Sequence, residues 1–65
     1  MHHFDSSAIS AADYDAASQQ MDVQFTSGSK WYTHYRVPAS VYYGFITASS
    51  AGSYYHDHIR GRYGP

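Results

Sequence analysis

Apolar and polar positions alternate most clearly in the middle of the chain. Residues Met21 to Phe25 alternate strictly, which is the pattern of a strand with one buried face. Residues Ile9 to Tyr14 form a weaker strand candidate, and the short polar residues at 15–18 suit a hairpin connection between the two. The first part of the chain therefore predicts an antiparallel pair of strands.

A third strand is predicted over residues 30–37, after a polar turn at 26–29. This run is rich in aromatic and β-branched residues, which favour strands. Trp31 lies on one face of it, and Tyr32 and His34 lie on the other. Because both faces carry aromatic rings, the alternation leaves open which face meets the core.

The pattern changes to a helical period after Pro38. Val41, Phe45 and Ala48 recur at the spacing of one helix stripe, which predicts a helix from about Pro38 to Ala48. Gly44 lies inside this helix, where Gly costs about 1 kcal/mol relative to Ala. We therefore expect another group to approach the helix closely at Gly44.

A second, shorter helix is predicted after residues 49–52, which break the first one. Ser53 is placed to cap it. One-turn spacing then pairs two sets of side chains in this helix: Tyr55 with Ile59, and Tyr54 with His58. Residues 61–65 are interpreted as an extended tail.

These elements predict a single domain over residues 1–65, with its core in residues 6–63 and short tails at both ends. The expected fold class is α+β, with a three-stranded antiparallel β-meander, one covering helix, and a short C-terminal helix or extended tail. The predicted core consists of Val23, Phe25, Val41, Phe45 and Ile59, with Tyr14 and Tyr32 at its margins.

Composition narrows the class of function. The chain has 65 residues, a formal net charge of −1 and no Cys, so it has neither disulfides nor thiolate metal sites. That composition is typical of a reducing compartment, and we expect a cytoplasmic protein. No apolar run approaches the ~20 residues of a membrane span, and the start of the chain lacks the pattern of a signal peptide. We therefore expect no membrane partner.

The residue types used in catalysis are present without a recognisable catalytic motif. Ser, His and Asp are plentiful, but the chain has neither a nucleophile elbow nor a phosphate-binding glycine loop. His56 and His58 are two positions apart, which directs them to different sides of a helix, whereas zinc needs three or four convergent ligands. We therefore expect no enzymatic activity, no metal site and no other cofactor, which leaves binding as the function.

Aromatic rings and cationic side chains are the candidates for that binding. Single-stranded nucleic acid is held by rings that stack on bases and by cations that contact phosphates. Aromatic and Arg side chains serve protein interfaces equally well. The predicted binding residues are Lys30, Trp31, Tyr32, His34, Arg36, Tyr54, Arg60 and Arg62.

The order of several different short residue groups along the chain resembles that of a known family. They are Ser6-Ser7, Val23-x-Phe25, Ser27-Gly28, Val37-Pro38, Val41-Tyr42, Gly44-Phe45, Ala48-Ser49-Ser50, Gly52, Tyr54-Tyr55, and Ile59-Arg60 with Tyr63. This order resembles the KTSC domain, and the resemblance covers Ser6 to Tyr63. The family occurs at the C-terminus of some lysyl-tRNA synthetases and as stand-alone proteins of bacteria and their phages, an association that implies RNA binding. The family's Tyr-x-Tyr is Tyr32-Thr33-His34 here.

Two functions remain open at this point. The first is a module that binds RNA or another single-stranded nucleic acid, which the synthetase association favours. The second is a protein-interaction module, such as a phage or mobile-element protein that binds and modulates a host protein complex, which the near-neutral charge favours. The sequence does not predict an oligomeric state.

Overall fold

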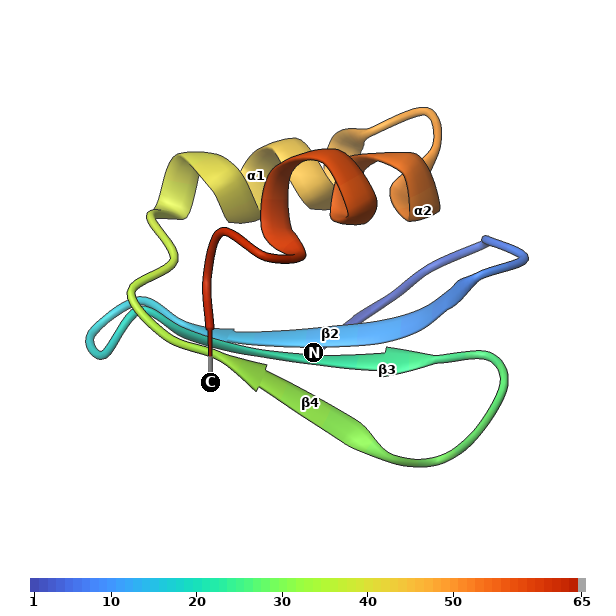
Figure 1. Cartoon of the computed structure of the whole chain (residues 1–65), viewed down its shortest axis with the longest axis horizontal. Helices are drawn as coiled ribbons and strands as arrows, with labels where there is room; N and C mark the ends of the chain where they lie inside the picture. The colour runs from blue at the N-terminus through green and yellow to red at the C-terminus, as the bar shows by residue number, and fades with distance from the viewer. Residues whose placement is uncertain (65) are drawn as a thin grey trace.

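The computed structural model describes residues 1–64 and shows an antiparallel sheet with all its helical segments on one face (Figure 1). The sheet has four strands in chain order: β1 (His2–His3), β2 (Ile9–Asp15), β3 (Gln20–Phe25) and β4 (Trp31–His34). The α+β class and the meander of β2, β3 and β4 are confirmed. The predicted number of three strands was wrong, because two residues are too few for β1 to produce an alternation pattern.

In β3, the predicted alternation of apolar and polar residues corresponds to alternating burial of their side chains. Met21 and Val23 are fully buried, whereas Asp22 and Gln24 alternate with them on the opposite face. In β2, an irregularity in the register after Ile9 breaks the simple alternation.

The predicted third strand was too long, because β4 ends at His34. Arg36 has a φ of 59°, in the left-handed region that a strand does not use. The backbone turns there, so that Val37 enters the core and its N–H donates to the Gln19 carbonyl at 2.9 Å.

Helix α1 (Ala39–Thr47) begins directly after Pro38, close to the predicted bounds. Its Gly44 lies against Tyr54 of the next helix, α2 (Ala51–Tyr54), where a Cβ would lie only 2.7 Å from the Tyr54 Cζ atom. The Tyr54 hydroxyl donates to the Val41 carbonyl of α1 at 3.1 Å. The expected close approach at Gly44 is therefore confirmed, and Gly is needed because a larger residue would collide with the ring.

The second helical segment begins earlier than predicted. Ser50, not Ser53, caps α2, because the Ser50 Oγ accepts the N–H of Ser53 at 3.3 Å. The chain continues into the π-helical turn η1 (Tyr55–Ile59), in which the Arg60 N–H donates to the Tyr55 carbonyl. Tyr55 and Ile59, one turn apart, are both buried, although only Ile59 was predicted to be a core residue.

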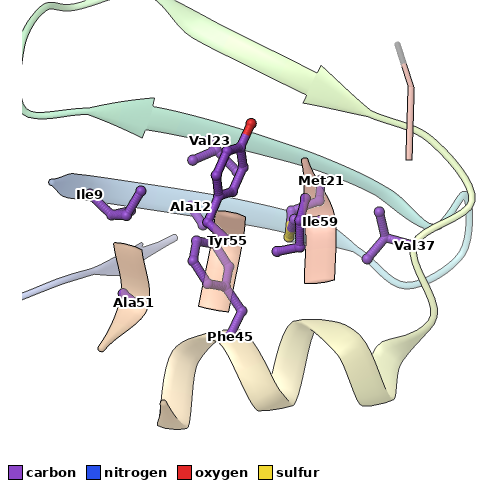
Figure 2. Packing of buried hydrophobic residues seen from close by; sticks show 9 residues of the cluster. All are labelled: Ile9, Ala12, Met21, Val23, Val37, Phe45, Ala51, Tyr55 and Ile59. Atoms are coloured by element: carbon purple, nitrogen blue, oxygen red, sulfur yellow. The ribbon is translucent and has the colours of Figure 1, made fainter. Parts of the chain in front are cut away.

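The core lies between the sheet and the helical layer (Figure 2). Of the predicted core residues, Val23, Phe45 and Ile59 are fully buried, whereas Phe25 and Val41 are only partly buried against them. Several core residues were not predicted: Ile9, Ala12, Met21, Val37, Ala51 and Tyr55. The core thus contains aliphatic residues from β2, β3 and the segment after β4 as well as from the helical layer.

Residues 60–64 fold back onto the sheet instead of forming an extended tail. The Tyr35 N–H donates to the Gly64 carbonyl at 3.0 Å, beyond the end of β4. The last residue of the predicted tail, Pro65, lies outside the described residues. Within residues 1–64, no helix is both long enough and apolar enough to cross a membrane.

Candidate binding groove

The register of β3 and β4 separates the aromatic residues that the sequence places on one strand. Tyr32 lies opposite the buried Val23 and therefore shares the face that the helices cover. Trp31 lies opposite Gln24, on the face without helices. Trp31 and Tyr32 therefore cannot form one stacking platform.

A groove lies at the edge of the helix-covered face, where the end of β3 meets α2 and η1. Its volume is about 390 Å³, at the low end of the about 300–1,000 Å³ that is usual for small-molecule sites. It is lined by Ala8, Ile9, Phe25, Tyr32, Gly52, Tyr55, His56 and Arg60. Two of the predicted binding residues, Tyr32 and Arg60, therefore lie together in this groove.

The walls of the groove are mainly aromatic rings. The Phe25 ring packs edge to face against Tyr32 at a centroid distance of 5.4 Å and against Tyr55 at 5.1 Å. Tyr32 keeps 44% of its surface exposed, so its ring is open to a ligand. The more buried Phe25 ring therefore packs against Tyr32 on one side and against Tyr55 on another.

Cationic side chains stand beside these rings. The Lys30 Nζ atom lies 5.2 Å from the centre of the Tyr32 ring, within the range of a cation–π interaction. Arg60 and His56 lie four residues apart, at the end of η1 and within it, and line the groove on its helical side. One permanent cation, Arg60, thus lines the groove with the exposed Tyr32 ring, and a second, Lys30, lies next to that ring.

His34, predicted as a stacking residue, is buried and cannot contact a base. Its ring is 7% exposed, and both of its nitrogens are hydrogen-bonded. Nδ1 lies 2.6 Å from the Tyr63 carbonyl, which can only accept, so Nδ1 carries the proton. Nε2 then accepts from the Tyr55 hydroxyl at 2.9 Å. The prediction for His34 was therefore wrong, because the residue joins three segments of the interior.

The paired Tyr55 and His34 resemble a nucleophile and its base, but their environment argues for a structural role. Burial is the main influence on the Tyr55 hydroxyl and raises its pKa, although the nearby Arg60 guanidinium partly opposes this effect. The phenol therefore stays protonated at neutral pH. No group of three or more His or Asp side chains within residues 1–64 is arranged to hold a metal ion.

The other predicted binding residues lie outside the groove. Arg36 lines a separate hollow with Tyr35 and Ser18 at the far end of β4. The Tyr54 ring packs between Phe45 and His58, so its role is structural.

Arg62 is exposed beyond η1, and its Nε donates to the Asp57 carbonyl at 3.1 Å. It was predicted as a binding residue because it is a cationic side chain, yet of the two neighbouring Arg residues only Arg60 lines the groove.

Phe25, Tyr55 and His56 line the groove but were not among the predicted binding residues. Phe25 and Tyr55 were interpreted as core or helix-packing residues, and both do pack against the core. The four-residue spacing of His56 and Arg60 on a helix was the one signal that could have linked His56 to the groove.

The antiparallel sheet, with its helical layer on one face, defines a small α+β domain. The model of the KTSC domain matches residues 5–63, and the chain belongs to this family, which confirms the resemblance seen in the order of its residues. The chain is similar to a protein from Tsukamurella paurometabola, with 36% identity over 63 residues that cover 97% of this chain and 92% of the relative. It is also similar to the crystal structure of a KTSC domain protein from Yersinia pestis, with a TM-score of 0.89 and 26% identity. That match covers 95% of this chain and 86% of the other.

Proposed function

We propose that this domain is a non-enzymatic cytoplasmic binding module that holds single-stranded RNA in the groove. One observation carries the proposal: the exposed Tyr32 ring and the cationic Lys30 and Arg60 meet at one site. A base stacks on Tyr32 while the neighbouring phosphates contact the two cations. The volume of about 390 Å³ is large enough to admit a base.

The distribution of charge supports this choice despite the formal net charge of −1. The Asp side chains of β2 and β3 point away from the groove, because Asp13 and Asp22 share the face that has no helices. Phosphates that approach Lys30 and Arg60 therefore do not face these sheet carboxylates, and the acidic residue nearest to Arg60 in the sequence is Asp57 of η1. Local charge, not net charge, sets the attraction at the short range of a phosphate contact.

Titration of fluorescein-labelled single-stranded oligouridine, followed by anisotropy, tests the proposal. Tyr32→Ala removes the stacking ring and is expected to cost about 1–3 kcal/mol of binding free energy. Arg60→Gln removes a phosphate contact and is expected to reduce the salt slope of log K by about 1. The matched controls are Tyr43→Ala, which removes a 66% exposed ring on α1, and Arg36→Gln at the far end of β4.

Equal loss of affinity in the groove and control variants would contradict the groove as the RNA site. The absence of any binding to RNA at about 50 mM salt, where phosphate contacts are strong, would contradict RNA as the ligand. Recovery of an intact protein partner from RNase-treated lysate, with no RNA bound in untreated lysate, would favour the protein-interaction function instead.

A further inference from the structure

The face of the sheet that the helices leave open (Figure 1) carries acidic side chains. In the antiparallel register, Asp13 lies directly opposite Asp22, and Asp15 follows Asp13 on the same face two residues later. The strands β1 to β4 contain these three Asp residues and no Lys or Arg. This open face is therefore anionic, whereas Lys30 and Arg60 lie at the groove.

Trp31 gives the open face an aromatic contact surface. Its side chain is 37% exposed, and together with Met1, Asp13 and Asp22 it lines a hollow of about 270 Å³. Trp is one of the residues most enriched at the energetic centres of protein interfaces. An exposed indole beside two carboxylates is thus a surface suited to a cationic protein segment.

The Asp13–Asp22 pair is unfavourable in the isolated domain, because like charges directly opposite each other destabilise a sheet. Among residues 1–64, each carboxylate has one polar contact. The Thr33 hydroxyl donates to Asp22 Oδ1 at 2.6 Å, and the terminal ammonium of Met1 lies 3.7 Å from Asp13 Oδ1. The second contact is an exposed ion pair, which contributes little. A cationic group that reaches both carboxylates would relieve the repulsion between them.

We propose that the open face docks an arginine-bearing segment of a partner protein, with the guanidinium over Trp31 and between Asp13 and Asp22. Cβ atoms of directly opposite residues lie about 4.5–5.5 Å apart, a span that one planar guanidinium with its fork of N–H donors can bridge. The same planar group stacks on an indole better than an ammonium does. Charge complementarity selects this occupant, since the phosphates of a nucleic acid would be repelled here.

The probe for this proposal is an octapeptide of alternating Gly and Arg, with alternating Gly and Glu as the matched peptide of opposite charge. Trp31 is the only Trp of the chain, so indole fluorescence reports on this face directly. We expect saturable binding of the Arg peptide with a change in indole emission. The double variant Asp13→Asn, Asp22→Asn is expected to bind the Arg peptide with about tenfold lower affinity. Asp57→Asn, a charge-matched control on η1, should leave this affinity unchanged.

Both Asn substitutions conserve shape, and the amide introduced at position 22 keeps an acceptor oxygen for the Thr33 hydroxyl, so circular dichroism should show an intact fold. If the double variant unfolds, titration of Trp31→Phe with the Arg peptide, followed by amide chemical shifts, provides a second test. This variant should bind the Arg peptide with lower affinity. Arg60→Gln should not affect the peptide, which separates this proposal from RNA binding in the groove. Equal binding of the Glu peptide, unchanged affinity in the Asn and Phe variants, or shift changes confined to the groove would overturn the proposal.

Discussion

A Gly44→Ala substitution would place a methyl group against the Tyr54 ring. In an open helix this change stabilises by about 1 kcal/mol, because Gly is a poorer helix former than Ala. Here the new Cβ would lie 2.7 Å from Tyr54 Cζ and 2.9 Å from Cε2, so the ring has to move. The ring is restrained, because its centroid lies 4.5 Å from that of His58 and its hydroxyl donates to the Val41 carbonyl. The substitution should therefore destabilise the domain.

The size of the effect follows from three contributions. Overpacking costs about 1–3 kcal/mol, and the loss of the Tyr54 hydrogen bond costs about 0.5–1.5 kcal/mol. The gain in helix propensity at Gly44 offsets about 1 kcal/mol of this, which leaves a net loss of about 0.5–3.5 kcal/mol. In a domain of this size, each kcal/mol lowers the Tm by roughly 4–8 °C.

A double-mutant cycle measured by urea denaturation isolates the contact. In a Tyr54→Ala background the ring is absent, so Gly44→Ala should stabilise by up to about 1 kcal/mol, a reversal of sign. Gly28→Ala serves as a control without packing, because no heavy atom lies within 4 Å of the point that a Cβ would occupy there. The reasoning is refuted if Gly44→Ala raises the free energy of unfolding of the wild-type protein, or has the same effect in both backgrounds.

Four further predictions concern the interior and the helix cap. His34→Ala leaves the Tyr63 carbonyl and the Tyr55 hydroxyl without a partner, so urea denaturation should show a loss of at least about 2 kcal/mol. ¹⁵N NMR should find the proton of neutral His34 on Nδ1, and a proton on Nε2 would contradict the network. Because burial raises the pKa of Tyr55 from 10.0, its protonated phenol supports the fold below pH 10, and this support is lost as the pH rises through the higher folded-state pKa. The free energy of unfolding should thus fall more steeply above pH 10 in the wild type than in Tyr55→Phe, and equal slopes would argue against the burial effect. Thermal denaturation should show that Ser50→Ala lowers the free energy of unfolding by about 0.5–2 kcal/mol and Ser53→Ala by less than about 0.5 kcal/mol. The reverse order would indicate that Ser53 is the capping residue.

The elements with a strong local signal were predictable from the sequence. Strict alternation located β3, and Pro38 with the helical stripe located α1. β1 was not predictable, because its two residues form a strand only by pairing with Ala11 and Ala12 of β2. The end of β4 was missed because the left-handed backbone at Arg36 is held by tertiary contacts that local preference does not report.

The candidate site was only partly predictable, because two of its determinants are long-range. Aromatic rings on both faces of β4 left the exposed face undecided, and only the pairing of Tyr32 with Val23 resolves it. The burial of His34 depends on partners 21 and 29 residues away in the sequence, Tyr55 and Tyr63. Composition alone could not show that the Asp residues of the sheet and the cations near the groove occupy different faces.

The contact between Tyr35 and Gly64 lies next to an edge of the sheet. β4 is an edge strand, and unpaired backbone groups along such an edge can recruit strands from other molecules. The folded-back end of the chain satisfies the Tyr35 N–H and, through the Tyr63 carbonyl, fixes His34 at the end of the same strand. Shortening the chain before Tyr63 would remove both contacts and leave the Tyr35 N–H, directly after the edge strand, free to pair with another chain.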